Sequence, residues 1–179
     1  MAYKHGIYGR EVPTSLVPMT QINAGLPVVF GTAPIHLATN PAKVNEPVLC
    51  YKYDEAVQSL GYSDNWADYT LCEFMYSQFA LFNMAPVVFV NVLDPAVHKT
   101  TVNDQTAEVQ EDKMVILPAT DAVLIPSLKV KSAEDDGELV KNTDYTAAYN
   151  SDGQLVITIL KEAVTAGSNI KLSFDKLNP

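Results

Sequence analysis

The amino-acid sequence predicts an α+β protein in which a small α/β domain of sheet and helices precedes an antiparallel β-sandwich or barrel. Residues 25–95 contain apolar runs in the order strand, strand, helix, helix, strand, which is typical of an α/β unit. The later runs are short, β-rich and separated by turn residues, which is typical of a sandwich. We therefore expect an extended arm over residues 1–24, the α/β domain over 25–98 and the β-sandwich domain over 99–179.

Two short strands and a helix are predicted at the start of the α/β domain. Residues 26–32 and 47–51 are apolar runs of strand length, bounded by proline-containing loops. Residues 54–60 predict a short helix, because Asp54 is a suitable N-cap and Gly61 suits the position just past the helix end.

A helix joined to a strand is the most strongly marked unit of the chain. Apolar residues occupy most of the circumference of residues 68–83, which predicts a helix buried on several sides. Asp68 is placed to cap its start, and Asn83 with Pro86 marks its end. The uninterrupted apolar run 87–93 predicts a strand covered on both faces. The neighbours that cover this unit must come from elsewhere in the chain or from another chain.

Short β-rich runs recur through the second half of the chain. The turn residues at 150–153 predict a hairpin between two of these runs. Several runs alternate apolar and polar residues, which predicts a sheet with one solvated face. The runs cover residues 114–117, 123–125, 128–131, 145–149, 155–160 and 170–174.

Composition and charge exclude several classes of function. The hydrophobic fraction is 47% and the charged fraction 18%, as in ordinary globular proteins. A formal net charge of −9 opposes direct nucleic-acid binding, which depends on Lys and Arg contacts to phosphates. No apolar run is long enough to span a membrane, and the first residues lack the apolar region of a secretory signal. We expect synthesis in a cytoplasm, and neither a nucleic-acid nor a membrane partner.

The residues that could act in catalysis or bind a metal are scattered along the sequence. His5, His36 and His98 lie in predicted arm or loop regions and have no partner at a catalytic or metal-binding spacing. Cys50 and Cys72 lie in apolar contexts without a CxxC motif, which favours two buried, reduced thiols. We therefore expect no catalytic residues, no cofactor and no metal site.

The first 24 residues predict an extended arm. Pro13 and Pro18 exclude a continuous helix, and glycines weaken one further. The arm nevertheless carries apolar residues that need a surface to lie on. An edge strand or a tail wrapped on the same subunit explains the pattern equally well.

The order and spacing of several short motifs resemble the tail sheath proteins of contractile-tailed phages and related prophage particles of the R-type bacteriocin kind. The resemblance extends over essentially the whole chain, and its motifs are mostly structural. The motifs are GIYGREVPT (6–14), VPMT (17–20), GLPVVFGT (25–32), EPVLC (46–50), YDEAVQSLG (53–61), the helical segment from Asp68 and PVVFVNVL (86–93).

The resemblance implies a structural, non-enzymatic role. Sheath subunits polymerise around a tail tube, exchange strands through extended arms and contract to drive ejection. It implies a location in the virion tail sheath after assembly in the bacterial host cytoplasm, with other copies of the chain, the tail tube protein and the baseplate as partners. The residues that match the family's N-terminal arm, and hence a subunit interface, are Gly6, Ile7, Tyr8, Val12 and Pro13.

The resemblance also implies a difference from the family. Its members continue into a larger, catalytically inactive α/β domain and a C-terminal arm, so we expect this chain to be a truncated or short form with an incomplete α/β domain. Two other functions remain open. One is a non-enzymatic binding module whose β-sandwich recognises a ligand or a surface, and the other is a small enzyme with its site on scattered loops.

Overall fold

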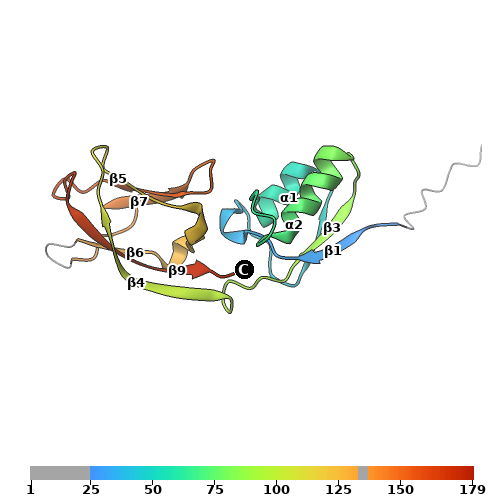
Figure 1. Cartoon of the computed structure of the whole chain (residues 1–179), viewed down its shortest axis with the longest axis horizontal. Helices are drawn as coiled ribbons and strands as arrows, with labels where there is room; N and C mark the ends of the chain where they lie inside the picture. The colour runs from blue at the N-terminus through green and yellow to red at the C-terminus, as the bar shows by residue number, and fades with distance from the viewer. Residues whose placement is uncertain (1–24, 133–136) are drawn as a thin grey trace, which may run out of the picture.

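The computed structural model describes residues 25–132 and 137–179. Its long axis separates two parts, with the helices and the first three strands at one end and the remaining strands at the other (Figure 1). The fold is α+β, as the sequence predicts, with a small α/β domain followed by a β-rich region.

The α/β domain is built on a three-stranded mixed sheet. Strand β3 (Val87–Asn91) lies in the centre, parallel to β1 (Val28–Gly31) and antiparallel to β2 (Pro47–Cys50). Helix α1 (Tyr53–Leu60) follows β2, and helix α2 (Thr70–Met75) continues directly into a π-helical segment, η2 (Tyr76–Leu81). A short 3-10 helix, η1 (Ile35–Leu37), follows β1. The strands and helices of the predicted α/β unit are therefore present in the predicted order.

Both helices pack on one face of this sheet (Figure 1). The core between sheet and helices is apolar, and alternate residues of each strand point into it because successive strand residues face opposite sides of the sheet. Its buried members are Ala33, Cys50, Ala56, Leu60, Leu71, Met75, Phe79, Val87 and Phe89.

The prediction that the second helix is buried on several sides is wrong for part of its surface, whereas β3 is buried at residues of both its faces, namely Phe89 towards the helices and Val90 on the opposite face. Phe74, Leu81 and Phe82 are exposed, although Leu71 and Met75 are fully buried. No described helix covers the face of the sheet opposite α1 and α2. No described element buries Phe74, Leu81 or Phe82.

The two predicted helix caps are also wrong. Helix α1 begins at Tyr53 after Lys52, so Asp54 lies inside its first turn. Helix α2 begins at Thr70, and the carboxylate of Asp68 instead accepts a hydrogen bond from Asn65 Nδ2 at 2.6 Å. The C-terminal cap of α1 is as predicted, since Gly61 ends the helix with a φ of 76°.

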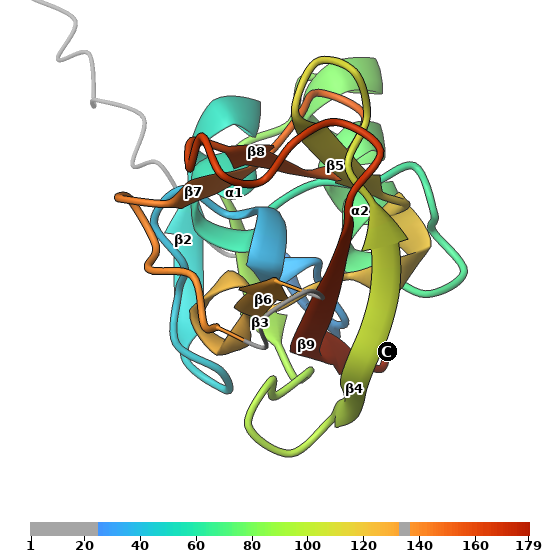
Figure 2. The same ribbon diagram turned by 90° about the vertical axis from the view of Figure 1, so that its left-hand side faces the viewer.

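The β-rich region consists of two three-stranded sheets. One has the order β4 (Lys99–Glu108), β9 (Asn169–Leu177), β6 (Lys129–Ser132), and the other β5 (Met114–Leu117), β8 (Leu155–Ile159), β7 (Tyr145–Tyr149). All pairings are antiparallel. Figure 2, which looks along the long axis, shows one sheet above the other. Alternate residues of β8 and β9, including Ile157 and Leu172, fill the space between them.

The sequence prediction missed β4 and misplaced one short strand. Strand β4 is largely exposed and consists mostly of polar residues, three of them Thr, so it lacks the apolar alternation on which the prediction relied. Residues 123–125 form an isolated bridge through Val123 and the start of a 3-10 turn, η4 (Ile125–Ser127), instead of a strand. A further 3-10 turn, η3, spans Ala119–Asp121. The predicted hairpin at 150–153 joins β7 to β8.

Candidate assembly surface

The face of the sheet that points away from the helices is apolar. Neighbouring strands place Val28, Val88 and Leu49 in one row across the sheet. A second row contains Phe30, Val90 and Pro47. We call these six residues the open sheet face.

The outer strands leave this face exposed. Val28 is 52% exposed, Phe30 68% and Leu49 47%. Leu26 and Val92 flank the face and are also exposed. A sheet normally buries its apolar face against another layer, because apolar area removed from water stabilises the folded state. The open sheet face is therefore a surface that lacks its second layer within the described residues.

The two outer strands also have free edges. In the part of the chain that the structure describes, β1 and β2 each pair with β3 alone. A free edge presents unpaired backbone N–H and C=O groups, which favour pairing with an added strand. The edge of β1 lies close in sequence to the predicted arm, whose last residue precedes Gly25.

A second apolar surface lies on the helix layer. Phe74, Leu81, Phe82 and Met84 are 43–66% exposed and come from α2, η2 and the segment that follows them. We call these four residues the outer helix surface. Glu73 is the only charged residue between positions 70 and 93, and such depletion of charge is typical of the core of a protein interface.

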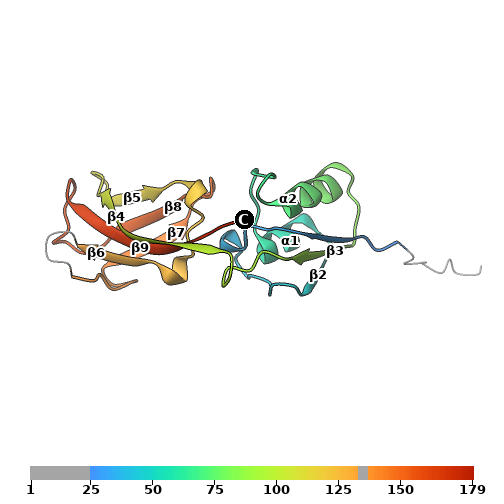
Figure 3. The ribbon, with the colours of Figure 1, turned by 60° about the horizontal axis from the view of Figure 1, so that its bottom comes forward.

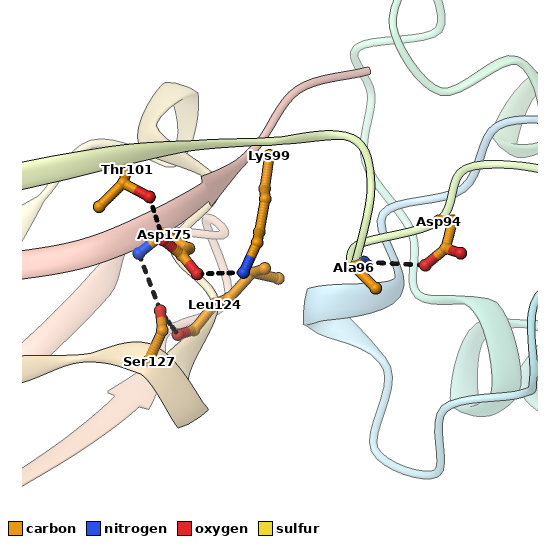
Figure 4. Close-up of polar contacts among 7 residues, drawn as sticks. All are labelled: Asp94, Ala96, Lys99, Thr101, Leu124, Ser127 and Asp175. Carbon is orange, nitrogen blue, oxygen red and sulfur yellow. Dashed lines mark hydrogen bonds and ion pairs between the residues drawn. The ribbon is translucent and has the colours of Figure 1, made fainter.

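Polar contacts fix the strand pair that leads from the α/β domain into the sandwich (Figure 4). The Asp175 carboxylate accepts hydrogen bonds from Lys99 Nζ and from Thr101 Oγ1, each at 2.6 Å. Its backbone N–H donates to Ser127 Oγ at 2.8 Å. The hydrogen bonds from Lys99 and Thr101 lower the pKa of the Asp175 carboxyl below its ordinary value. The contacts of Lys99 and Thr101 hold β4 against β9, which lie side by side in Figure 3, and the contact of Ser127 joins β9 to the 3-10 turn that precedes β6.

A cluster of apolar residues joins the two ends of the molecule. Leu177 at the end of β9 packs with Ile35, Tyr69, Cys72 and Leu93 of the α/β domain. All five side chains are buried. The two parts therefore share a small core, which sets the position of the sandwich relative to the sheet.

A cleft beside this cluster contains His36. The His36 ring lies 6.0 Å from the Tyr69 ring and 5.5 Å from the Tyr149 ring, measured between centroids. Burial lowers the pKa of His36 to about 4, and its buried Nδ1 has no hydrogen-bond partner in the described structure. The carboxylates that line the cleft are Asp64 and Asp152. At neutral pH the imidazole is uncharged and packs as a ring between two tyrosines.

The two cysteines are buried and unpaired. Burial raises the pKa of the Cys50 and Cys72 thiols to about 11 in each case, so both are protonated at neutral pH and are weak nucleophiles. Within residues 25–132 and 137–179, no group of three or more potential metal ligands occurs. In the same ranges, no helix has the length and apolar character needed to cross a membrane.

The predicted subunit-interface residues lie outside the described residues. Gly6, Ile7, Tyr8, Val12 and Pro13 all precede Gly25, so their interface role stays a prediction. Comparisons with protein-family models, curated proteins and solved structures gave no match.

The open sheet face was missed by reasoning from the sequence. The uninterrupted apolar run of β3 correctly indicated that both faces need burial, but one strand does not reveal what covers them. The sequence of β1 contained an indication of this face, because Val28 and Phe30 are apolar and alternate with the helix-facing Val29 and Gly31.

Proposed function

We propose that the chain is a non-enzymatic structural subunit of a contractile tail sheath, which polymerises with copies of itself around a tail tube. The observation that best supports this proposal is the α/β domain with two free strand edges and an open apolar sheet face. A domain with these features gains stability by association, because each uncovered edge and face is satisfied by a neighbouring chain.

The arm supplies the connection between subunits in this proposal. Residues 6–13 carry spaced apolar side chains, and the arm that contains them precedes β1 in the sequence. A strand added to a free edge gains main-chain hydrogen bonds, and its alternate side chains set the register. Strand exchange of this kind keeps subunits linked while they reorient during contraction. The tail tube protein and the baseplate are the further partners, and the virion tail is the location.

The proposal is tested by measuring particle size by light scattering on the intact chain and on a variant that lacks residues 1–20. The proposal predicts oligomers of the intact chain and smaller particles of the shortened one. Two identical monomers would contradict arm exchange as an intrinsic property of this chain.

A binding module is the second candidate function, and the cleft between the sandwich and the α/β domain favours it. The hairpin residues Asn150 and Asp152 line this cleft together with the Tyr149 ring and His36. Clefts with aromatic walls and a few polar groups are typical ligand sites. A binding module would remain monomeric and would retain its fold and its ligand binding after removal of the arm.

A further inference from the structure

We propose that copies of this chain associate head to tail, with the outer helix surface of one copy packed on the open sheet face of the next. This inference rests on the proposed function, because it names the contact through which the α/β domains of a polymer meet. It requires no element beyond the described residues, and one contact covers both exposed apolar surfaces.

The chemistry of the two surfaces is complementary. The open sheet face lacks a helical layer, and the outer helix surface belongs to a helical layer that has a sheet on only one side. Packing an apolar helix surface on an apolar sheet face is the ordinary solution for α/β layers. Neither surface contains a charged residue that the contact would bury unpaired.

The exposed area is smaller than a stable specific interface requires. A fully exposed large side chain offers about 150–200 Å², so the roughly half-exposed residues provide on the order of 400 Å² on each surface. A contact between the two would bury on the order of 800 Å², which is below the range of about 1,200–2,000 Å² for stable specific interfaces. The contact is therefore weak alone and gains strength when a second link, such as the arm, joins the same two copies.

The two surfaces differ, so the contact is heterologous. A contact between unlike surfaces leaves one of each surface free at the two ends of a dimer, and further copies add there. A pair of like surfaces, such as two open sheet faces, would instead form a closed dimer. Repetition of the head-to-tail contact forms a closed ring if the rotation between neighbours closes, and an open filament if it does not.

The test uses two variants of the full chain, Phe30→Asp on the open sheet face and Phe82→Asp on the outer helix surface. Both side chains are about two-thirds exposed, at 68% and 66%, so neither change disturbs the core. Val97→Asp is the matched control, since Val97 is 71% exposed and lies outside both surfaces. Average mass is measured by light scattering against concentration, and circular dichroism checks folding.

Each single variant should lose the concentration-dependent rise in mass that the intact chain and the Val97→Asp control show. An equimolar mixture of the two variants should regain association, but only to dimers. The Phe30→Asp variant keeps an intact outer helix surface and the Phe82→Asp variant keeps an intact open sheet face, so one contact can form between the two. Unchanged association of either variant, or a mixture that stays monomeric, would overturn the inference. Stronger association after removal of residues 1–20 would also overturn it, since the arm would then cover the face within its own subunit.

The outcomes separate this inference from the proposed function. If the chain lacking residues 1–20 loses association while both point variants keep it, arm exchange stands and the head-to-tail contact is wrong. If the point variants lose association while the shortened chain keeps it, the head-to-tail contact stands and arm exchange is wrong.

Discussion

Phe30 of β1 stands in register with Val90 of β3, and the two side chains lie on the same face of the sheet, pointing away from the helices. Phe30 is 68% exposed, whereas Val90, in the central strand, is 6% exposed. A phenylalanine in this position costs solubility and stabilises little unless another layer covers it. The pair therefore marks the face on which the proposed assembly depends.

Replacing Phe30 by Ser should reduce self-association with little effect on stability. Because Phe30 is mostly exposed, the free energy of unfolding should change by no more than about 0.5 kcal/mol. Binding of a hydrophobic dye to the native protein should fall at the same time. Unchanged dye binding would show that the open sheet face is already covered in solution.

Replacing Phe89 by Ala should destabilise the α/β domain strongly. Phe89 is on the same strand but faces the helices and is fully buried, so its loss leaves a cavity and should cost about 3–5 kcal/mol. Chemical denaturation followed by hydrogen exchange measures this cost and locates it. Equal loss of protection in β8 would contradict the assignment of Phe89 and of the buried β8 residues to two different core clusters.

Replacing Gly61 by Ala should destabilise the end of helix α1. Gly61 has a φ of 76°, and an added Cβ would lie 2.2 Å from the carbonyl oxygen of Pro34. Since backbone must move to relieve this contact, the expected cost is at least about 2 kcal/mol. Gly25→Ala is the control, because nothing lies within 4 Å of a Cβ built there. Thermal melts of the two variants should differ clearly, and equal melts would contradict the described turn.

Protonation of His36 should weaken the fold between pH 6.5 and pH 4. The pKa of His36 is about 4 in the folded protein and about 6.5 when unfolded, so the unfolded chain takes up the proton first as the pH falls. Stability from the neutral ring is complete above pH 6.5 and decreases towards pH 4, by about 3 kcal/mol at most. A His36→Phe variant should lack this decrease, whereas His98→Gln should keep it. A persistent decrease in His36→Phe would assign the effect to another group.

Replacing Asp175 by Asn should loosen the start of β4. The folded pKa of the Asp175 carboxyl lies below its ordinary value of 3.8, so its contribution is present above that value and is lost as the pH falls through the folded pKa. The replacement should cost about 0.5–1 kcal/mol at pH 7 and remove the acid-dependent loss below pH 3.8. Denaturation at neutral and acidic pH measures both effects. Equal acid sensitivity of the two proteins would contradict the role of Lys99 and Thr101.

The order of most helices and strands could be predicted from the sequence because their buried apolar residues recur at regular spacings. The alternation of Ile170, Leu172 and Phe174 predicted β9, and the turn residues at 150–153 predicted a hairpin. Strand β4 escaped prediction because its stabilising contacts are backbone pairing with β9 and the Lys99 ion pair, neither of which has an apolar period.

The candidate surface was less predictable than the fold. Phe74, Leu81 and Phe82 are as apolar as the buried Met75. The sequence therefore does not distinguish a residue that is buried within its own chain from one that is exposed there. The cleft that contains His36 is formed in part by the rings of Tyr69 and Tyr149. These two residues are 80 positions apart in the sequence, so no local pattern indicates that they meet. The order of the family-like motifs pointed to assembly, but not to the surface on which assembly depends.

The measurement that tests the central claim most directly is the mass of the intact chain by light scattering over a wide range of concentration. Self-association through the α/β domain predicts a mass that rises with concentration above that of the 19.6 kDa monomer, without a plateau at the dimer. A stable protein with the monomer mass at every concentration would contradict the account.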